Sequence, residues 1–482
     1  MKHEQIRAAV LRRSVFSAAV VLLFLFFLCG QLNFYLAESL KNGVYLFVPP
    51  VLIAGALYFC RPRGRTEYRL LLLYMLWILV TRALNGDPTL SRSYRFVLDL
   101  ALMLPFLLLG LTLDRAGRRR VLNWLSVLLG LYFFALGALC VFAFLRRTSF
   151  YNPVTGGVLA GVSSTTYFAR ANILDTSPNA TAYWFFMPLS LMLYQFFAVR
   201  HKIWRIPIVL SALLDWLVIC LTFCRSIRLA CALSFALLAA ILIGRALAER
   251  GTALRILAVC AAFLLVLGLS YKACAWAAGG VGLLSRETES PTAAAEAAPG
   301  ETAQHPAVTA VTLSARHLSA EAESAVYSDP REEASGLDSI SSERLTVYRA
   351  VWQTLREHPR MLLFGCDPDA GMALVNAKLP KSVVHCHNFL LQTLLLAGLP
   401  GFLLILAFCV YLLAAAIRLL FSEAPLTAKL LALPVLSSLL FGQFEAGFFN
   451  YTDARTLFFY LLCGLLLGTY YDGFSPKRNA GN

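Results

Sequence analysis

Apolar stretches of membrane-spanning length recur along most of the chain and are separated by short basic segments. A helix needs roughly 20 mainly apolar residues to cross a bilayer, and about twelve stretches approach that length. The tenth is long enough to include a broken or interfacial first turn. The pattern therefore predicts an all-α, polytopic membrane protein. The predicted spans are residues 15–36, 43–59, 68–84, 94–113, 121–145, 179–198, 206–223, 227–247, 254–272, 387–417, 427–444 and 456–471.

The composition agrees with this class. The 482 residues are 59% hydrophobic and only 14% charged, whereas soluble domains contain about 25% charged residues. Residues 16–28 resemble the core of a signal peptide behind Arg12 and Arg13, but no convincing cleavage site follows them. We therefore keep this segment as an uncleaved first helix. The net charge of +15 accompanies no nucleic-acid-binding module.

Lysine and arginine residues predict the orientation, because they concentrate in the short cytoplasmic loops of membrane proteins. When the N-terminus is placed in the cytoplasm, most basic clusters fall inside and both termini are cytoplasmic. Residues 1–272 then hold helices one to nine of a protein of the cytoplasmic (inner) membrane. Residues 273–386 form one large extracytoplasmic loop between helices nine and ten, and residues 387–482 hold the last three helices.

The large loop divides into two parts. Residues 285–342 are rich in Ala, Glu, Ser, Thr and Pro, and we expect a disordered acidic insert because such a segment cannot bury enough apolar surface to fold. A tether or partner site is its functional alternative. Residues 343–384 open with an amphipathic helix that Ser342 can cap and that ends at His358-Pro359. We expect it to cover the outer mouth of the bundle, with an apolar stripe of Leu345, Tyr348, Val351, Trp352 and Leu355.

Several cations stand in short outer loops, against the usual topology signal. Any one of them could simply reach towards a lipid phosphate. As a set with few acids beside them, they favour an anionic ligand at the outer surface. They are Lys41, Arg82, Arg92, Arg95, Arg146, Arg147, Arg170, Arg225, Arg228, Lys272 and Arg455.

Motifs around the tenth helix resemble those of the O-antigen ligase and polymerase superfamily. Residues 344–365 contain an Arg-Leu-x-x-Tyr helix, His-Pro and Leu-Phe-Gly, and they are followed by His387-Asn388-x-x-Leu391 and Gly398-x-x-Gly401. The large outer loop, the arginine-bearing turn between helices seven and eight, and Pro178-Asn179-Ala180 at the start of the sixth helix are also similar to that superfamily. The similarity extends over residues 178–405.

This resemblance implies a GT-C-type glycosyltransferase that acts outside the membrane and needs no metal or other cofactor. Such enzymes move a glycan from undecaprenyl diphosphate to an acceptor hydroxyl on a lipid, another glycan, a wall polymer or a protein. Two departures weaken any inference about donor or acceptor. The turn reads Cys224-Arg225-Ser226 where the family usually has Ser-Arg-Gly, and Cys366-Asp367 stands where a second glycine usually follows Gly365.

By the same resemblance His387 is the catalytic base, since an imidazole can take the proton of an attacking hydroxyl near neutral pH. His385 is its rival for that role and otherwise a substrate contact. Asn388 is expected to orient the base or to contact sugar. The structural alternative for His387 is an interfacial histidine that caps the tenth helix.

Three arginines are the expected contacts of the diphosphate. Arg225 and Arg228 lie about one helical turn apart and share a face if the eighth helix begins near Cys224. A guanidinium suits this role because it holds phosphate oxygens bidentately and stays charged. Arg344 is a weaker third cation. The structural alternative for Arg225 is a role in topology or lipid contact.

Other polar groups carry weaker signals. His385 and His387 with Cys386, or Asp367 with Asp369, could be drawn as a metal site, but neither set supplies all the ligands of a zinc ion, so we expect no metal.

Asp215 lies within the seventh predicted span, where a carboxyl group is costly, and we expect it to form a buried hydrogen bond. Glu445, Asp453 and Arg455 could contact sugar or pair with one another. One disulfide among the outward-facing Cys274, Cys366 and Cys386 is compatible with the sequence, although no paired spacing supports it.

The competing functional class is a transporter or flippase for lipid-linked glycan. Such proteins usually contain repeats and broken helices near the midplane of the membrane, whereas this sequence has no convincing repeat and places its candidate site at one surface. The sequence does not separate a ligase from a polymerase, because the two share their chemistry.

Overall fold

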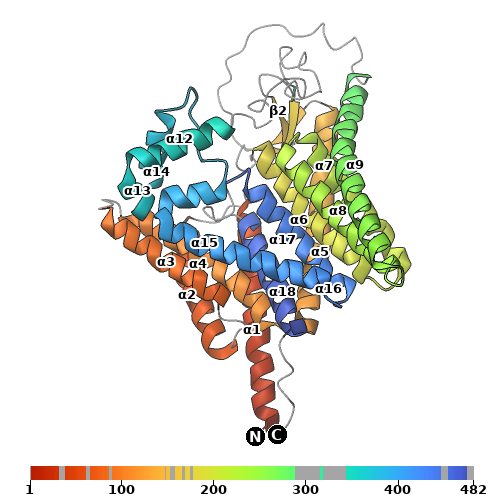
Figure 1. Ribbon diagram of the computed structural model, residues 1–482, viewed down its shortest axis with the longest axis horizontal. Coiled ribbons are helices and arrows are strands. Elements are labelled where there is room, and N and C mark those ends of the chain that lie inside the picture. The colour runs from red at the N-terminus through yellow and green to blue at the C-terminus, as the bar shows by residue number, and fades with distance from the viewer. Residues whose placement is uncertain are drawn as a thin grey trace, which may run out of the picture.

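Each predicted span overlaps a helix in the computed structural model (Figure 1). The structure describes residues 2–31, 38–60, 66–85, 90–146, 148–151, 158–164, 169–173, 177–287, 315–317, 344–446 and 454–474. The helices at these positions are α1 (Lys2–Gln31), α2 (Glu38–Gly55, continued by the π-helical η1, Ala56–Cys60), α3 (Thr66–Leu84), α4 (Leu90–Thr112), α5 (Arg115–Leu145), α6 (Pro178–Ala198), α7 (Arg205–Leu221), α8 (Arg225–Ala246), α9 (Thr252–Glu287), α15 (Phe389–Phe421), α16 (Leu426–Leu430) with α17 (Ala432–Gly442), and α18 (Ala454–Phe474).

Six helices in the described part of the chain are long and apolar enough to cross a membrane, by length and composition alone. They make the protein a membrane-embedded helical bundle. The full set of twelve crossings stays a prediction. The six segments are Arg115–Leu145, Lys202–Leu221, Arg225–Ala246, Thr252–Ala277, Phe389–Phe421 and Ala454–Phe474.

A small antiparallel sheet departs from the predicted all-α class. Its strands β1 (Thr148–Tyr151), β2 (Val158–Ser164), β3 (Ala169–Ile173) and β4 (Ala315–His317) are ordered β3-β2-β1-β4. The first three follow α5, where the alternation of side chains is too weak to predict strands. Residues 315–317 belong to the segment predicted to be disordered, so that prediction was wrong for them. Apart from the last turn of α9, the rest of the acidic insert lies outside the described residues.

Three short helices form a cap at the end of the bundle opposite the chain termini: α12 (Arg344–Glu357), α13 (Pro359–Phe364) and α14 (Pro368–Asn376) (Figure 1). The predicted amphipathic helix is confirmed, and it ends where His358-Pro359 was expected to end it. Its buried residues are Val347, Ala350, Val351, Thr354 and Leu355. Trp352 was wrongly placed in the apolar stripe, because its side chain is 45% exposed. Ser342, the expected cap, lies outside the described residues.

Helix α17 packs between α6 and α8 through paired hydroxyl groups. Ser437 Oγ lies 2.7 Å from Ser234 Oγ of α8, and Ser438 Oγ lies 2.9 Å from the Tyr183 hydroxyl of α6. The Tyr183 ring also stacks on Phe441 with a centroid distance of 5.2 Å. Such small polar residues allow close helix approach in an apolar environment. The contacts fix the direction in which the chain leaves α17.

The thiols of Cys274, Cys366 and Cys386 are free and buried. The disulfide considered from the sequence is therefore not formed in this structure.

Asp215 does not make the hydrogen bond predicted for it. Its side chain is completely buried in α7, and neither carboxyl oxygen has a partner among the described residues. A buried polar group without a partner carries its full desolvation cost, so Asp215→Leu is expected to raise the free energy of unfolding by about 1–3 kcal/mol. Thermal unfolding of the purified protein in detergent measures this change. Asp215→Asn, which keeps the polar group, should give no comparable gain, and a lower melting temperature for Asp215→Leu would contradict the explanation.

Candidate active site

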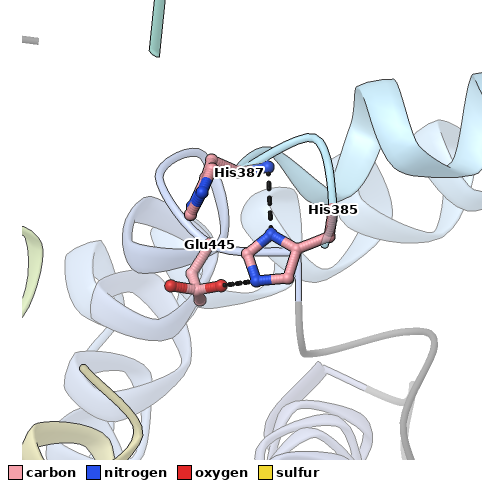
Figure 2. A group of neighbouring side chains, drawn as sticks. All are labelled: His385, His387 and Glu445. Carbon is pink, nitrogen blue, oxygen red and sulfur yellow. Dashed lines mark hydrogen bonds and ion pairs between the residues drawn. The ribbon is translucent and has the colours of Figure 1, made fainter. Parts of the chain in front are cut away.

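Two loops meet beneath the cap and bring His385, His387 and Glu445 together (Figure 2). The histidines precede α15, and Glu445 follows α17. Asn388 begins α15 as its N-cap, because its Oδ1 accepts a hydrogen bond from Leu391 N at 3.0 Å. The adjacent Phe389 is buried and anchors the helix start. The local sequence therefore fixes where the His387 loop ends.

Both ring nitrogens of His385 are engaged. Its Nδ1 accepts a hydrogen bond from the backbone N–H of His387 at 3.2 Å, and its Nε2 lies 2.9 Å from Glu445 Oε1. Because Nδ1 accepts, the proton of the neutral ring sits on Nε2 and is donated to the carboxylate. His385 consequently has no ring nitrogen left to act as a base in this arrangement.

The ring of His387 is in the opposite situation. Its Nδ1 is buried and has no hydrogen-bond partner in the described part of the chain. The imidazole lies with its ring centroid 4.3 Å from that of His385. The backbone of His387 adopts a φ of 52°, which is uncommon for a residue other than glycine. The fold thus holds His387 in a constrained conformation and leaves its Nδ1 without a hydrogen-bond partner among the described residues, which favours it over His385 as the base.

Burial lowers the pKa of His387 to about 4, and the neighbouring His385 and the Arg344 charge act in the same direction, while Glu445 opposes them. Burial alone would raise the pKa of Glu445. The hydrogen bond from His385, with the charges of His385, His387 and Arg344, holds that pKa below its usual range. At neutral pH the site therefore combines a neutral His387 ring with an ionised Glu445.

Tyr348 connects the cap to both loops. Its hydroxyl lies 3.0 Å from the His387 carbonyl oxygen and 2.9 Å from the Gln443 carbonyl oxygen. Asn388 adds a second link, since its Nδ2 donates to the Gln443 carbonyl oxygen at 3.1 Å. Both the oxygen and the nitrogen of the Asn388 amide are therefore bonded within the protein, which supports the orienting role predicted for Asn388 rather than sugar contact.

Tyr348→Phe removes this hydroxyl and its bond to the His387 carbonyl oxygen, whereas the Gln443 carbonyl oxygen keeps the hydrogen bond from Asn388. The loss of a hydrogen bond of about 0.5–1.5 kcal/mol should slow the base catalysis that the sequence predicts for His387 by roughly 2-fold to 10-fold, without removing the protein from membranes. Turnover of the purified variant measures the effect. Trp352→Phe on the exposed face of the same helix is the matched control, and an equal loss in both variants would mean that α12 as a whole, and not the hydroxyl, is responsible.

The ligand atoms of His385, His387 and Glu445 lie within 4.8 Å of one another, so the three could hold a metal ion. The hydrogen bonds argue against that use in the observed arrangement. A metal at His385 Nε2 would move the proton to Nδ1, which would then face the N–H of His387 and lose its hydrogen bond. The geometry fits an acid–base cluster better than a metal centre.

Arg344 is the first residue of α12 and lies close enough to the site to affect both His387 and Glu445. Its guanidinium carbon stands 5.8 Å from the centroid of the Phe444 ring, next to Glu445. Its Nε is buried and lacks a hydrogen-bond partner among the described residues. The structure thus places Arg344, the weakest of the three predicted cations, beside the histidine cluster.

Helix α8 begins at Arg225 directly after Cys224, which meets the condition set for Arg225 and Arg228 to share a helix face. The two arginines of its first turn do not share an environment. Arg225 is half-buried, whereas the Arg228 side chain is only 1% exposed, donates from Nη2 to the Cys220 carbonyl oxygen at 3.1 Å and packs against the Phe223 ring. The prediction that both point to a ligand at the surface was wrong for Arg228, because the turn between α7 and α8 encloses it.

The start of α6 shows that Arg225 and the histidine cluster lie at the same end of the bundle. Arg170 of β3 donates to Asn179 Oδ1 at 2.9 Å and to the Thr222 carbonyl oxygen at 2.6 Å, just before Arg225. Tyr183, one turn further along α6, bonds to Ser438 of α17, which leads to Glu445. The first turns of α6 therefore contact both the segment that leads to Arg225 and the helix that leads to Glu445.

The fold accounts for several outer cations that were expected to form a ligand site. Arg82 pairs with Asp367 at 3.2 Å, and Arg170 and Arg228 bond to backbone carbonyl groups. Arg146 lies over the Phe142 ring and Arg455 over the Trp184 ring. These contacts give the five residues structural roles at the bundle end, and an anionic ligand for the remaining cations stays a prediction. The side chains of Lys41, Arg92, Arg95 and Arg147 lie outside the described residues.

Sequence reasoning missed the partnership of Glu445 with His385. Glu445 stood out only as one acid in the last outer loop, expected to contact sugar or to pair with Asp453 or Arg455. Asp453 lies outside the described residues, and Glu445 pairs with His385 instead. No local signal could have found this pair, because the two residues come from different loops. In comparisons with known proteins, neither a family model nor a curated protein matches the chain.

Proposed function

We propose that the protein is a glycosyltransferase that transfers a glycan from undecaprenyl diphosphate to an acceptor hydroxyl, as a ligase, with His387 as the base and no metal. One observation carries the proposal: His387 combines an Nδ1 that has no hydrogen-bond partner among the described residues with a backbone held by Tyr348 and by His385, which is itself paired with Glu445. A base needs this combination of a rigid backbone and an available lone pair.

In the proposed step the acceptor oxygen attacks the anomeric carbon of the donor. The bond between that carbon and the diphosphate oxygen breaks, and the acceptor proton passes to His387. Undecaprenyl diphosphate leaves with its negative charge, which Arg225 and Arg344 stabilise by charge-assisted hydrogen bonds. Arg228 takes no direct part, because it is buried against Phe223 and Cys220.

The proposed setting is the cytoplasmic (inner) membrane, with both termini in the cytoplasm and the active site on the extracytoplasmic face. The distribution of basic residues supports it through the positive-inside rule. The site lies at the end of the bundle away from the chain termini (Figure 1). A lipid-linked donor would reach such a site from the outer leaflet, with membrane lipids around the bundle.

The lipid-linked glycan pool tests this proposal in cells. A deletion strain is complemented with wild type, His387→Ala or the control His201→Ala, whose exposed side chain precedes α7 at the far end of the bundle. Mass spectrometry should find lipid-diphosphate glycan accumulating only with His387→Ala, at equal protein levels. Long accumulated chains indicate a ligase and single repeat units the polymerase alternative. An unchanged pool would overturn the catalytic role, and accumulation on the cytoplasmic face would favour a flippase.

A further inference from the structure

A second polar site lies at the opposite end of the bundle from His387. Helix α5 begins there and runs towards the sheet, while α6 runs from the sheet to this end and stops at Ala198. Between them and the segments of α16 and α18 is a cavity of about 280 Å³. Its polar lining residues are Arg115, Arg118, Arg119, Tyr194, Thr427 and Thr469.

The cavity is built around a buried cation. Arg118 is only 3% exposed, and its guanidinium donates to the Leu113 carbonyl oxygen and pairs with Asp472. Arg119 is held by a hydrogen bond from its Nη2 to the Ala198 carbonyl oxygen at 3.3 Å. These contacts fix the positions of two arginines at the wall of one cavity.

The charge of the cavity is positive. Its lining includes three arginines and, among the residues that the structure describes, no carboxylate. The nearby Asp472 is paired with Arg118, and Asp114 accepts a hydrogen bond from Gly117 N at 2.7 Å as the N-cap of α5. Arg115 and Arg119 line the same cavity as Tyr194. Such an arrangement attracts an anion with several acceptor oxygens.

Part of the lining is apolar. Leu122, Phe197 and Leu431 face the cavity beside the arginines. A soluble phosphate has no apolar group to place against these three side chains, whereas a phospholipid has an apolar tail beside its charged head. Basic pockets between transmembrane helices, on the side where basic residues concentrate, are suited to anionic lipid heads.

We propose that this cavity binds a phosphate group, and that an anionic phospholipid of the surrounding membrane supplies it. Arg115 and Arg119 contact the phosphate oxygens, while Arg118 stays in its ion pair and shapes the wall. The bound lipid would connect α5, α6, α16 and α18 at their ends. This site is independent of the chemistry proposed for His387.

Native mass spectrometry of the full chain in detergent, titrated with phosphatidylglycerol, tests the proposal. The double variant Arg115→Gln/Arg119→Gln should bind the first lipid about 30-fold more weakly, since each cation near a lipid head contributes about 1 kcal/mol. The control is Arg245→Gln/Arg250→Gln, which removes two exposed arginines near the end of α8 at the same end of the bundle. Its lipid affinity should stay close to that of wild type.

Three outcomes would overturn the proposal. Equal weakening in both double variants would mean diffuse surface attraction, and unchanged binding in the first would remove the cavity from consideration. Displacement of phosphatidylglycerol from wild type by inorganic phosphate, but not by chloride at equal ionic strength, would assign the cavity to a soluble phosphate. These experiments measure lipid binding and do not depend on transfer activity. The test therefore remains valid if the glycosyltransferase proposal fails.

Discussion

His387→Ala is expected to lower the rate of the proposed glycan transfer by about 10²-fold to 10⁴-fold, the usual contribution of a positioned base. His387 Nδ1 has no hydrogen-bond partner in the described part of the chain, so removal of the imidazole breaks no hydrogen bond at that atom, although it removes the ring contact with His385. The backbone contacts from His385 and Tyr348 remain in the variant. The purified protein with a lipid-linked donor should therefore lose turnover while keeping its melting temperature.

His385→Gln is the matched comparison for this prediction. It removes the ring that holds both the His387 N–H and Glu445, so His385 acts as a positioning residue. We expect a smaller loss of turnover than in His387→Ala, together with a lower melting temperature. If His385→Gln loses at least as much turnover as His387→Ala at an unchanged melting temperature, His385 is the base and the assignment here is wrong.

The pH profile of the wild type gives an independent readout of the same ring. Burial lowers the pKa of His387 to about 4 in the empty site. A base is active above its pKa, so kcat/KM should fall only as the pH drops towards about 4. A bound diphosphate adds negative charge beside the imidazolium and raises its pKa, so kcat should fall at a higher pH than kcat/KM. If kcat and kcat/KM fell at the same pH on the acid side, this explanation would be contradicted.

Local patterns predicted the parts of the site that depend on neighbours along the chain. The apolar runs located the helices, and the amphipathic spacing located α12. The tenth predicted span, residues 387–417, started two residues before α15. These features follow from helical periodicity and capping, which act over a few residues.

Features that depend on tertiary contacts could not be predicted in this way. The pairing of His385 with Glu445 and the enclosure of Arg228 arise where separate segments meet. Asp215 shows the limit most clearly, since its burial was predicted correctly and its hydrogen bond was not. Whether a buried carboxyl group finds a partner depends on neighbouring helices, and the sequence of α7 alone contains no information on them.

Two glycines of the family-like motifs meet at one crossing in the structure. Gly365 ends α13 with a φ of 69°, and Gly398 interrupts α15 with a φ of 62°. A Cβ on Gly365 would lie 2.2 Å from the Leu396 carbonyl oxygen, and a Cβ on Gly398 would lie 2.4 Å from the Leu363 carbonyl oxygen. The backbones of the two segments are therefore in direct contact. This contact explains why both positions require glycine and why the long α15 bends there.

Gly398→Ala is accordingly expected to lower the free energy of unfolding by at least about 3 kcal/mol, the combined result of a left-handed backbone and a clash with another backbone. The cap carries Tyr348, so its displacement should also remove the contact to His387 and abolish transfer. Thermal unfolding in detergent measures the loss of stability.

Gly268→Ala provides the control for this substitution. Gly268 lies within α9 and has nothing within 4 Å of an added Cβ, so alanine should be neutral or stabilise that helix by up to about 1 kcal/mol. A Gly398→Ala protein that melts like wild type would show that α13 and α15 can separate without cost. In that case the crossing would be a flexible joint, and the constrained position of His387 would have to come from Tyr348 and His385 alone.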